Sequence, residues 1–326
     1  MKKILIVSYG DDSHKNCLVS TAERLGHESI LFDAGGYPNT GDELSVDLTG
    51  TEPAIKMHLS NSPIKPGEIA GVWWRRPRGS KANQNLNGLD QYKHLEGEVL
   101  IRSLADLLPN ANWISDPEAT RMACRKTVQL VLAKKMGIKI PLTCLGNSPE
   151  SVKSFVSYLK GRKMIVKPIG TSFIDMSKDK GESKVVFTKI IEPSLLLENI
   201  DLVKNCPVIF QEAVEKEYDL RITVVDNKVF SAKVVLEGCS DPSNVDWRNH
   251  DGKRQYERHS LPEEIAGQCA AFTKAIGLRF GCIDMAYSKK GGYTFFEINP
   301  QGQWLPSEYD LQYPISTALL ESLVKY

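Results

Sequence analysis

The chain has 326 residues, a length that corresponds to two or three domains of roughly 100–200 residues each. The hydrophobic share of 41% and the charged share of 25% are typical of a globular protein, and 41 basic against 40 acidic residues give no indication of binding to nucleic acid or to a membrane. The seven cysteines form no C-x-x-C pair, which argues against a zinc site and against a disulfide framework.

The first 115 residues are expected to form one domain around a parallel sheet. Residues 3–8 are apolar, and the polar residues 10–14 follow too soon for a signal peptide, so we expect a first strand and a cytoplasmic protein. An amphipathic helix and a second apolar run complete a βαβ unit, which implies parallel strands. The elements expected after the first strand are a helix over 16–25, strands over 27–32 and 71–77, and a helix over 91–108.

We divide the rest of the chain into a central part, residues 116–210, and a C-terminal part, residues 211–326. The central part is expected to hold helices over 118–136 and 150–160 and strands over 163–167, 185–188 and 208–214. The C-terminal part is expected to hold a hairpin with strands over 220–225 and 229–236, a long polar loop over 238–260, and helices over 262–276 and 315–324.

The last part also contains a second predicted hairpin, with apolar runs around residues 281–285 and 294–300. A four-residue loop over 289–292 would pair Ser288 with Tyr293, and the same register pairs Asp284 with Glu297. Opposed residues of an antiparallel pair share a face, and their Cβ atoms lie roughly 5 Å apart. Asn299 lies two residues beyond Glu297 and therefore shares that face. Two carboxylates and an amide oxygen converge there, which predicts a site for a hard cation such as Mg2+.

A plain solvated face is the alternative for these acids, because charged residues on hairpins usually point to water. That alternative requires polar neighbours. We expect Cys282, Ala286 and Phe295 on the same face as the acids, and carboxylates among apolar residues are costly unless they are paired or bind a metal. The pattern therefore favours a metal site.

Two lysines are candidates for contacts with phosphate. Lys167 ends an apolar strand before a turn that contains Gly170, where an ammonium group and free backbone N–H groups can meet a phosphate. The alternative for Lys167 is an ordinary lysine at the end of a strand. Lys126 lies in the helical pattern after the first domain and is unremarkable by itself.

Polar residues at the end of an apolar strand are the candidates for nucleotide recognition. Gln211, Glu212 and Val214 could present backbone groups to an adenine, and a nearby acid, Glu217 or Glu215, could bind ribose hydroxyls. A solvated charged turn is the alternative for this segment.

Arg221 alternates with apolar residues of the next strand, which indicates a cation aimed at a carboxylate or a phosphate. Lys233 on the partner strand, together with Asp246 and Arg248 in the long loop, could join Arg221.

Taken in order, these residues resemble the ATP-grasp superfamily over about residues 115–310, and the D…E-x-N ending is the most specific element. The first domain resembles the pre-ATP-grasp domain of that superfamily, so the expected fold class is α/β (α+β). Four stretches are more specifically similar to the graspetide synthetases, which are microviridin-type peptide macrocyclases. These stretches are VWWRRP at 72–77, CPVIFQE at 206–212, DWR at 246–248 and EINPQGQW at 297–304.

The resemblance implies ATP and Mg2+ as cofactors and assigns a role to each candidate. It implies that Lys126 and Lys167 bind the nucleotide phosphates, and that the hinge at Gln211, Glu212 and Val214 holds the adenine. It further implies the ribose at Glu217, the metal at Asp284, Glu297 and Asn299, and the transferred phosphate and acyl group at Arg221 and Arg248, with Lys233 as an additional catalytic candidate. The phosphate loop departs from the family pattern, because only Gly170 and two hydroxyl residues precede Phe173.

The activity that the resemblance implies is peptide macrocyclisation. ATP would phosphorylate Asp or Glu side chains of a ribosomal precursor peptide, and Ser, Thr or Lys side chains of the same peptide would then displace the phosphate. The precursor, a leader followed by a Thr/Asp/Glu-rich core, would be the partner, and a homodimer is compatible with the family. We expect the leader at a short helix that carries Glu198 and Asp201 on one face, with Asp246 as a further peptide contact, although a solvated helix face explains the same pattern.

Two other classes remain open. The first is an ATP-grasp ligase that adds glutamate or another amino acid to a peptide or protein end, and the 72–77 stretch favours macrocyclisation over it. The second is a nucleotide-binding regulatory protein without chemistry, which the complete set of Lys167, Asp284, Glu297 and Asn299 argues against.

Overall fold

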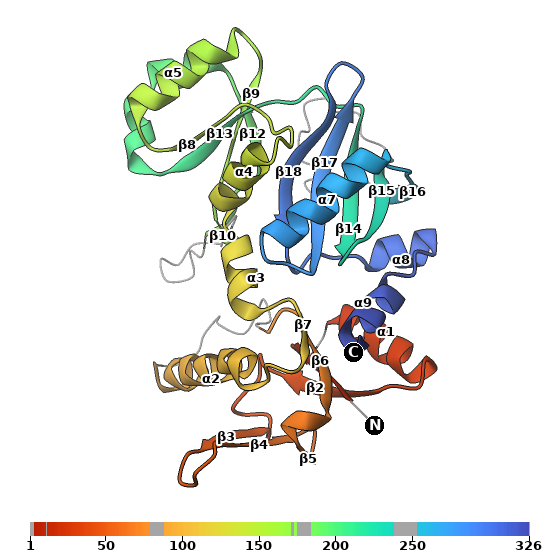
Figure 1. Ribbon diagram of the computed structural model, residues 1–326. Helices are drawn as coiled ribbons and strands as arrows, with labels where there is room; N and C mark the ends of the chain where they lie inside the picture. Colours follow the sequence, from red (N-terminus) through yellow and green to blue (C-terminus); the bar gives the residue numbers. More distant parts are fainter. Residues whose placement is uncertain are drawn as a thin grey trace.

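The computed structural model describes residues 3–10, 12–77, 88–170, 173–174, 184–237 and 253–325 (Figure 1). Its N-terminal part contains a four-stranded parallel sheet in the order β2-β1-β6-β7, as the βαβ pattern predicts. The strands are β1 (Lys3–Ser8), β2 (Glu28–Asp33), β6 (Ile69–Trp74) and β7 (Asn112–Ile114). The N-terminal part of the expected fold class is therefore confirmed.

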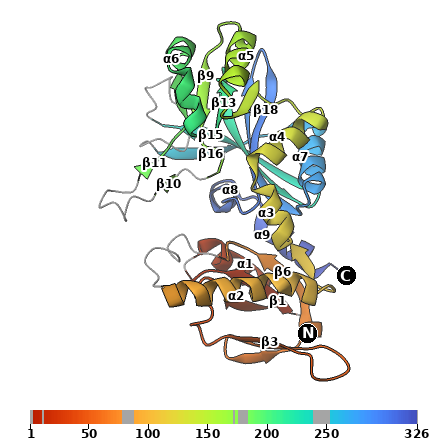
Figure 2. The same ribbon diagram turned by 90° about the vertical axis from the view of Figure 1, so that its left-hand side faces the viewer.

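Both faces of this sheet are buried, which explains why its strands are continuously apolar. Ile4 and Ile6 of β1 face one hydrophobic cluster, which also contains residues of α1 (Ser13–Arg24). Leu5 and Val7 face a second cluster, to which α2 (Gly88–Leu107) contributes. Figure 2 shows α2 across the sheet.

The segment between β2 and β6 forms a small antiparallel sheet, which the sequence pattern did not resolve. Its strands are β3 (Glu43–Asp47), β4 (Ala54–Leu59) and β5 (Ser62–Ile64), followed by the short helix η1 (Pro66–Glu68). Met57, Leu59 and Ile64 bury its apolar face in the second cluster of the N-terminal sheet.

The single helical pattern predicted over 118–136 is two helices, α3 (Pro117–Ala123) and α4 (Lys126–Lys135). Arg125 has an extended backbone (φ −81°, ψ 103°), which ends one helix and starts the next. The prediction of one helix was therefore wrong, because apolar spacing continues across the break while the backbone does not.

The central part is an antiparallel sheet in the order β12-β9-β13-β8, and its helices pack on the sheet in one hydrophobic cluster. Its strands are β8 (Thr143–Gly146), β9 (Met164–Lys167), β12 (Lys189–Ile191) and β13 (Val208–Glu212), and its helices are α5 (Pro149–Leu159), α6 (Pro193–Glu198) and η3 (Ile200–Asn205). The strand expected over 185–188 is displaced, because β11 (Lys184–Val185) pairs with β10 (Phe173–Ile174) and does not join this sheet. The boundary that we placed after residue 210 falls within β13.

The C-terminal part is a five-stranded antiparallel sheet in the order β16-β15-β14-β17-β18. Its strands are β14 (Tyr218–Val225), β15 (Lys228–Leu236), β16 (Arg254–Arg258), β17 (Phe280–Ser288) and β18 (Gly292–Asn299). The predicted hairpin across Asp226 and Asn227 is confirmed, and Asp226 takes the left-handed conformation (φ 51°). Helix α7 (Glu263–Ala275) packs on one face of this sheet, and the candidate site lies on the other face, part of which packs against the C-terminal helices. Of the expected loop over 238–260, residues 238–252 lie outside the described residues, and residues 254–258 form the strand β16.

Two helices follow the last strand and return the chain to its beginning. They are α8 (Leu305–Leu311) and α9 (Ile315–Val324). Helix α9 packs against α1, β6 and β7, and Figure 1 shows it beside α1. Gly71 of β6 lies so close to α9 that a Cβ atom there would meet the backbone of Leu323. Within the described ranges, each helix is too short or too polar to cross a membrane.

Candidate active site

The candidate site lies on the face of the C-terminal sheet opposite α7. Strand register places Arg221 of β14, Asp284 of β17 and Glu297 of β18 side by side in one row. The predicted pairing of Asp284 with Glu297 is confirmed. Asn299 pairs with Cys282 one step further along the same face.

The loop that joins β17 to β18 is shorter than predicted, and a bulge compensates for the difference. Ser288 pairs with Gly292 instead of Tyr293, so the loop has one residue fewer. The register then shifts between Met285, which pairs with Phe295, and Asp284, which pairs with Glu297. Phe296 is therefore the extra residue of a β-bulge.

The bulge also overturns the expected neighbours of the acids. Phe295 pairs with Met285 and packs on Phe272 of α7, with ring centroids 4.8 Å apart. It therefore lies on the core face, whereas we had expected it on the face of Asp284. Cys282 and Ala286 do lie on the acid face.

The cation at the centre of the row is Arg221. Its Nη1 donates to Oδ1 of Asp284 at 2.8 Å, and its Nη2 donates to the carbonyl oxygen of Gln303 at 3.1 Å. Both charged side chains are about 9% exposed. Burial alone would lower the pKa of Arg221, but the Asp284 carboxylate outweighs it and the net pKa is raised. Arg221 is thus fully charged and fixed next to the acid pair.

A second cation lies at the other end of the row. Nζ of Lys126, the first residue of α4, lies 3.4 Å from Oε2 of Glu297. Oδ1 of Asn299 accepts from the backbone N–H of Gln301 at 3.0 Å. Among the described residues, no cluster of three or more His, Cys, Asp or Glu side chains could hold a metal ion alone. Two carboxylates and one amide oxygen fit a hard cation that completes its shell with water and phosphate.

The other predicted phosphate ligand, Lys167, is the last residue of β9 and is half-buried. It pairs with Ile209 of β13, so it belongs to the central sheet and not to the row of Arg221. Figures 1 and 2 both show β9 and β13 next to β18.

The nucleotide hinge candidates lie at the junction between the central and C-terminal sheets. Gln211 is buried, and its Nε2 donates to Oγ1 of Thr143 at 2.8 Å. The backbone N–H of Glu212 donates to the carbonyl oxygen of Leu142 at 2.9 Å, and its carboxylate accepts from Nη1 of Arg162 at 2.9 Å. Val214 follows in the linker between β13 and β14.

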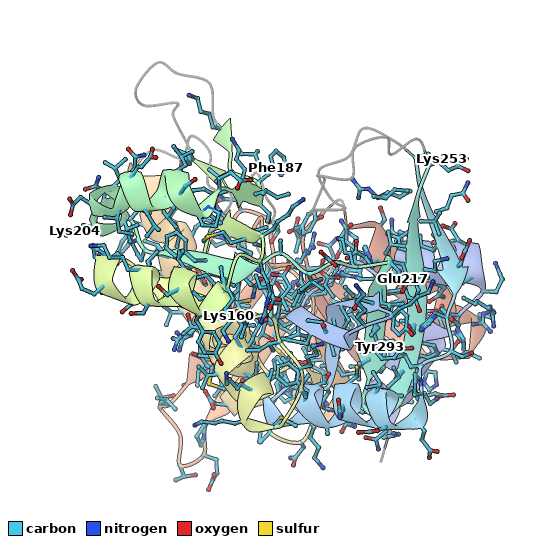
Figure 3. All side chains as sticks on the ribbon, turned by 90° about the horizontal axis from the view of Figure 1, so that it is seen from above. Lys160, Phe187, Lys204, Glu217, Lys253 and Tyr293 are labelled. Atoms are coloured by element: carbon cyan, nitrogen blue, oxygen red, sulfur yellow. The ribbon has the colours of Figure 1, made fainter. Side chains whose placement is uncertain are left out.

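The ribose candidate, Glu217, is exposed and lies at the same junction (Figure 3). Its Oε1 accepts from the backbone N–H of Lys289 at 2.7 Å, in the loop between β17 and β18. A contact with ribose hydroxyls would share this carboxylate with Lys289. Glu215 is also exposed, so the choice between the two acids stays open.

Several other candidates are not brought to this face. Lys233 pairs with Leu220, the neighbour of Arg221, and therefore points to the opposite face. There its Nζ forms an ion pair with Glu257 at 3.0 Å and lies 5.3 Å from the ring centroid of Tyr218. Asp246 and Arg248 lie outside the described residues.

The segment expected to bind a leader is not one continuous helix. Helix α6 ends at Glu198, Asn199 leaves the helical conformation, and Asp201 belongs to η3. Asp201 forms an ion pair with Lys204 at 2.8 Å. Val203 of the same η3 is buried in the core of the central part and is not available for apolar contact with a leader.

The structure adds one residue on the site face, Tyr256, that the sequence reasoning missed. Tyr256 of β16 pairs with Val234, which pairs with the buried Asp219 of β14. Burial raises the pKa of Tyr256, and its register with Val234 and Asp219 places it on the same face as Arg221. The alternation of Arg254, Tyr256 and Arg258 was the available signal for a strand.

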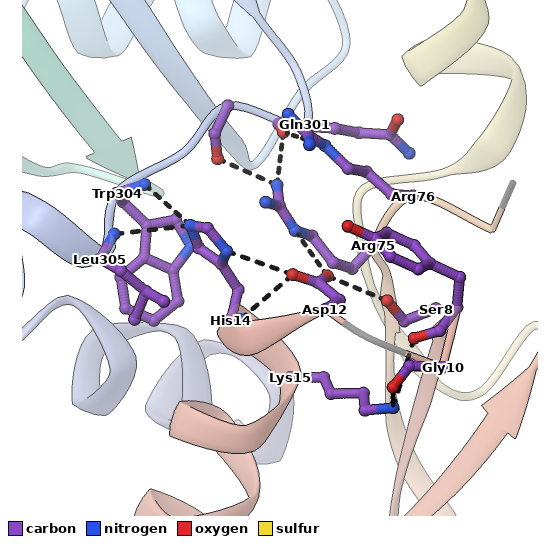
Figure 4. A network of polar contacts seen from close by, with 12 residues as sticks. Ser8, Gly10, Asp12, His14, Lys15, Arg75, Arg76, Gln301, Trp304 and Leu305 are labelled. Atoms are coloured by element: carbon purple, nitrogen blue, oxygen red, sulfur yellow. Dashed lines mark hydrogen bonds and ion pairs between the residues drawn. The ribbon is translucent and has the colours of Figure 1, made fainter. Parts of the chain in front are cut away.

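The loop that follows Asn299 is held by a buried polar network from the N-terminal sheet (Figure 4). Arg75 donates through Nη1 to the carbonyl oxygens of Gln301 and Gly302, the latter at 2.9 Å. Nε of Arg75 lies 3.2 Å from Oδ2 of Asp12, and burial lowers the pKa of Arg75 to about 10. The N-terminal part thus contacts the loop that separates Asn299 from Trp304.

His14 extends this network to α8. Its Nε2 accepts from the backbone N–H of Trp304 at 3.2 Å, and its Nδ1 lies 3.2 Å from Oδ1 of Asp12. An acceptor at Nε2 requires the neutral ring, with the proton on Nδ1. Burial lowers the pKa of His14 and favours this neutral form, although Asp12 opposes the shift.

Comparisons with known proteins agree with this geometry. The RimK-like ATP-grasp domain matches residues 123–323. The chain is also similar to the crystal structure of the macrocyclase MdnC from Microcystis aeruginosa MRC, bound with the precursor peptide MdnA, with 30% identity, a TM-score of 0.80 and 99% of each chain covered. A RiPP-associated ATP-grasp ligase from Chryseobacterium gregarium, in complex with ADP and a leader and core peptide, gives 26% identity and a TM-score of 0.81 over 99% of this chain and 96% of that chain.

The macrocyclase MdnB of the same Microcystis strain shares the fold at 24% identity, with a TM-score of 0.75 over the full length of both chains. No curated protein matches this sequence.

This chain belongs to the RimK-like ATP-grasp family, and it resembles the graspetide synthetases within that superfamily. It is therefore an ADP-forming ligase that uses ATP together with a divalent metal ion.

Proposed function

We propose that the chain is a peptide macrocyclase that uses ATP and Mg2+ to join acidic side chains of a ribosomally made precursor peptide to Ser, Thr or Lys side chains of the same peptide. The observation that carries the proposal is the row of Lys126, Glu297, Asp284 and Arg221 in a chain that aligns end to end with a macrocyclase bound to its precursor peptide. Two adjacent acids with a cation at each end can hold a metal–phosphate group next to a peptide carboxylate.

The chemistry has two balanced steps. A carboxylate oxygen of the peptide attacks the γ-phosphorus of ATP, which forms an acyl phosphate and releases ADP. A hydroxyl or amine of the same peptide then attacks the acyl carbon, forms an ester or amide, and releases inorganic phosphate and a proton. The peptide loses one water for each bond.

The residues of the chain are assigned as follows. Mg2+, held by Asp284, Glu297 and Asn299, would neutralise charge on the transferred phosphoryl group. Lys126 and Lys167 would bind phosphate oxygens. Arg221 is rigid and charged because of Asp284, so it is suited to orient the peptide carboxylate and the acyl phosphate.

The hinge and the loop candidates complete the assignment. The backbone around Glu212 and Val214 would face the adenine, and Glu217 the ribose. Arg248 and Asp246 remain candidates from the family resemblance.

A second candidate function is favoured by the name of the matching family. A RimK-like domain is compatible with ligation of free glutamate or another amino acid to a peptide or protein end. Both functions consume ATP, but they change the peptide mass in opposite directions.

Mass spectrometry distinguishes them. The purified chain would be incubated with ATP, Mg2+ and the short peptide encoded beside its gene, with and without free glutamate. Macrocyclisation predicts losses of whole water molecules that do not depend on glutamate, and ester bonds would be reversed by mild base. A mass gain that requires glutamate would instead establish the second function, and an unchanged peptide mass despite ATP turnover would count against both.

A further inference from the structure

The strand that carries two of the proposed metal ligands is an edge strand. β18 pairs with β17 on one side, and among the described residues no further strand of this sheet follows it. Backbone groups on the outer side of an edge strand lack partners unless another element provides them. Ile298, which lies between Glu297 and Asn299, directs its N–H and its carbonyl oxygen to that outer side.

Gln129 of α4 provides both partners for Ile298. Its Oε1 accepts from the N–H of Ile298 at 3.0 Å, and its Nε2 donates to the carbonyl oxygen of Ile298 at 2.8 Å. The same Nε2 donates to the carbonyl oxygen of Ala123 at 2.6 Å, at the end of α3. Gln129 is 2% exposed, so its carboxamide takes the place of a neighbouring strand at one residue.

The chain after α4 provides a second outer contact. The backbone N–H of Phe295 donates to the carbonyl oxygen of Lys139 at 2.8 Å. The contacts at Phe295 and Ile298 lie on either side of Phe296, the extra residue of the bulge. The outer side of β18 is thus fixed just before and just after the position where its register shifts.

Register matters here because side chains alternate along a strand. A slip by one residue turns every side chain to the opposite face. Without the bulge at Phe296, Glu297 and Asn299 would lose their common face with Asp284. Gln129 also lies three residues after Lys126 on the same helix, and the two residues contact Ile298 and Glu297, respectively.

We propose that Gln129 is a positioning residue of the metal site, whose buried carboxamide holds Ile298 and thereby keeps Glu297 and Asn299 on the face of Asp284. The role of these ligands in metal binding rests on the proposed function, whereas the hold on Ile298 does not. Gln129 is not a ligand itself, because its carboxamide is bonded to backbone groups of Ile298 and Ala123.

The test combines two measurements on the full chain. Gln129→Met keeps the side-chain length and removes the donor and the acceptor. Thr273→Val is the matched control, because Thr273 is also buried and its Oγ1 donates to the carbonyl oxygen of Cys269 at 2.8 Å, a hydrogen bond within α7 that does not involve the backbone of β18. Hydrogen exchange by mass spectrometry follows peptides that cover 293–301, and electron paramagnetic resonance follows the binding of Mn2+ in the presence of ADP.

We expect Gln129→Met to raise the exchange rate at 293–301 by roughly ten- to hundredfold, the effect of losing both hydrogen bonds of Ile298, and to weaken Mn2+ binding by a comparable factor. Thr273→Val should change neither quantity. Wild-type exchange in Gln129→Met would overturn the proposed hold on Ile298 and leave the proposed function intact. Faster exchange with unchanged Mn2+ binding would overturn the proposed role of Gln129 in positioning the metal ligands.

Failure of the wild-type protein to bind Mn2+ with ADP would instead contradict the proposed metal site, and the exchange data would still decide the hold on Ile298. If Gln129→Met does not fold, Gln129→Glu replaces it. A glutamic acid buried at this position is protonated below its raised pKa and keeps one donor and one acceptor. Exchange at 293–301 in this variant, corrected for the intrinsic rate, should rise with pH relative to wild type, and a constant ratio would refute the proposal.

Discussion

Asp284→Asn should both destabilise the protein and abolish ATP turnover, because Asp284 has a structural partner as well as a proposed metal. The substitution leaves the guanidinium of Arg221 buried, with its bonds to the Gln303 carbonyl oxygen but without a carboxylate. Removing one partner of a buried ion pair typically costs about 3–5 kcal/mol. The amide oxygen of asparagine keeps one acceptor, so we expect a value of about 3 kcal/mol.

Such a loss is measurable as a change in melting temperature. At about 2–4 °C per kcal/mol for a unit of about 150–250 residues, about 3 kcal/mol corresponds to a decrease of about 6–12 °C. Differential scanning calorimetry would measure the melting temperature, and ADP release would measure turnover at a temperature where the variant is folded.

Glu297→Gln is the matched comparison. Lys126 lies at 3.4 Å from Glu297, and the two side chains are 21% and 14% exposed, so this pair is longer and less buried than that of Arg221 and Asp284. We expect loss of turnover with a smaller decrease in melting temperature than in Asp284→Asn. A wild-type melting temperature for Asp284→Asn would refute the reasoning about the buried pair, whereas wild-type turnover in either variant would refute the metal assignment.

A double substitution separates charge burial from catalysis. Arg221→Met combined with Asp284→Leu replaces the pair by apolar side chains of similar size, an exchange that is often neutral for stability. The double variant should therefore melt closer to wild type than Asp284→Asn while remaining inactive.

Two further predictions concern the phosphates and the N-terminal network. Lys167→Ala should weaken ATP binding by about 1.5–3 kcal/mol through the loss of a charge-assisted hydrogen bond, and unchanged affinity in isothermal calorimetry would contradict its assignment. His14 has a lowered pKa in the folded state, so the unfolded state binds more protons as the pH falls below about 6.5, and stability that is present above that pH is lost on acidification. Between about pH 7 and pH 5, His14→Gln should lose less of its unfolding free energy than wild type, because glutamine cannot titrate. Denaturant titrations at several pH values would measure this loss, and an equal loss in both proteins would refute the role of His14.

Local patterns were sufficient to predict most strands and helices, and the pairing of Asp284 with Glu297. The position of Lys233 was also predictable, because a two-residue turn at Asp226 and Asn227 pairs Leu220 with Lys233 and leaves Arg221 on the other face. We placed Lys233 wrongly by considering strand order without register.

The bulge at Phe296 could not be predicted in the same way. Nothing in the local sequence distinguishes a bulged strand from a regular one here, since both place apolar residues around Glu297. Its outer contacts come from Gln129 and Lys139, and Gln129 is 169 residues away from Ile298. Helix α9 was predicted as a helix, but its packing against the first sheet depends on the tertiary fold.

The packing of α9 has a consequence for how the chain folds during synthesis. The cluster that covers one face of the N-terminal sheet joins Ile4, Ile6 and Trp73 to Ile315 and Leu319 of α9. The ribosome makes the sheet first, but α1 alone covers only part of this face until the residues of α9 have been added. Contacts between residues so far apart in the sequence form late and slow the folding of the whole chain. The N-terminal sheet should thus reach full protection only after the rest of the chain is complete, and the exposed face is where chaperones would act in the interval.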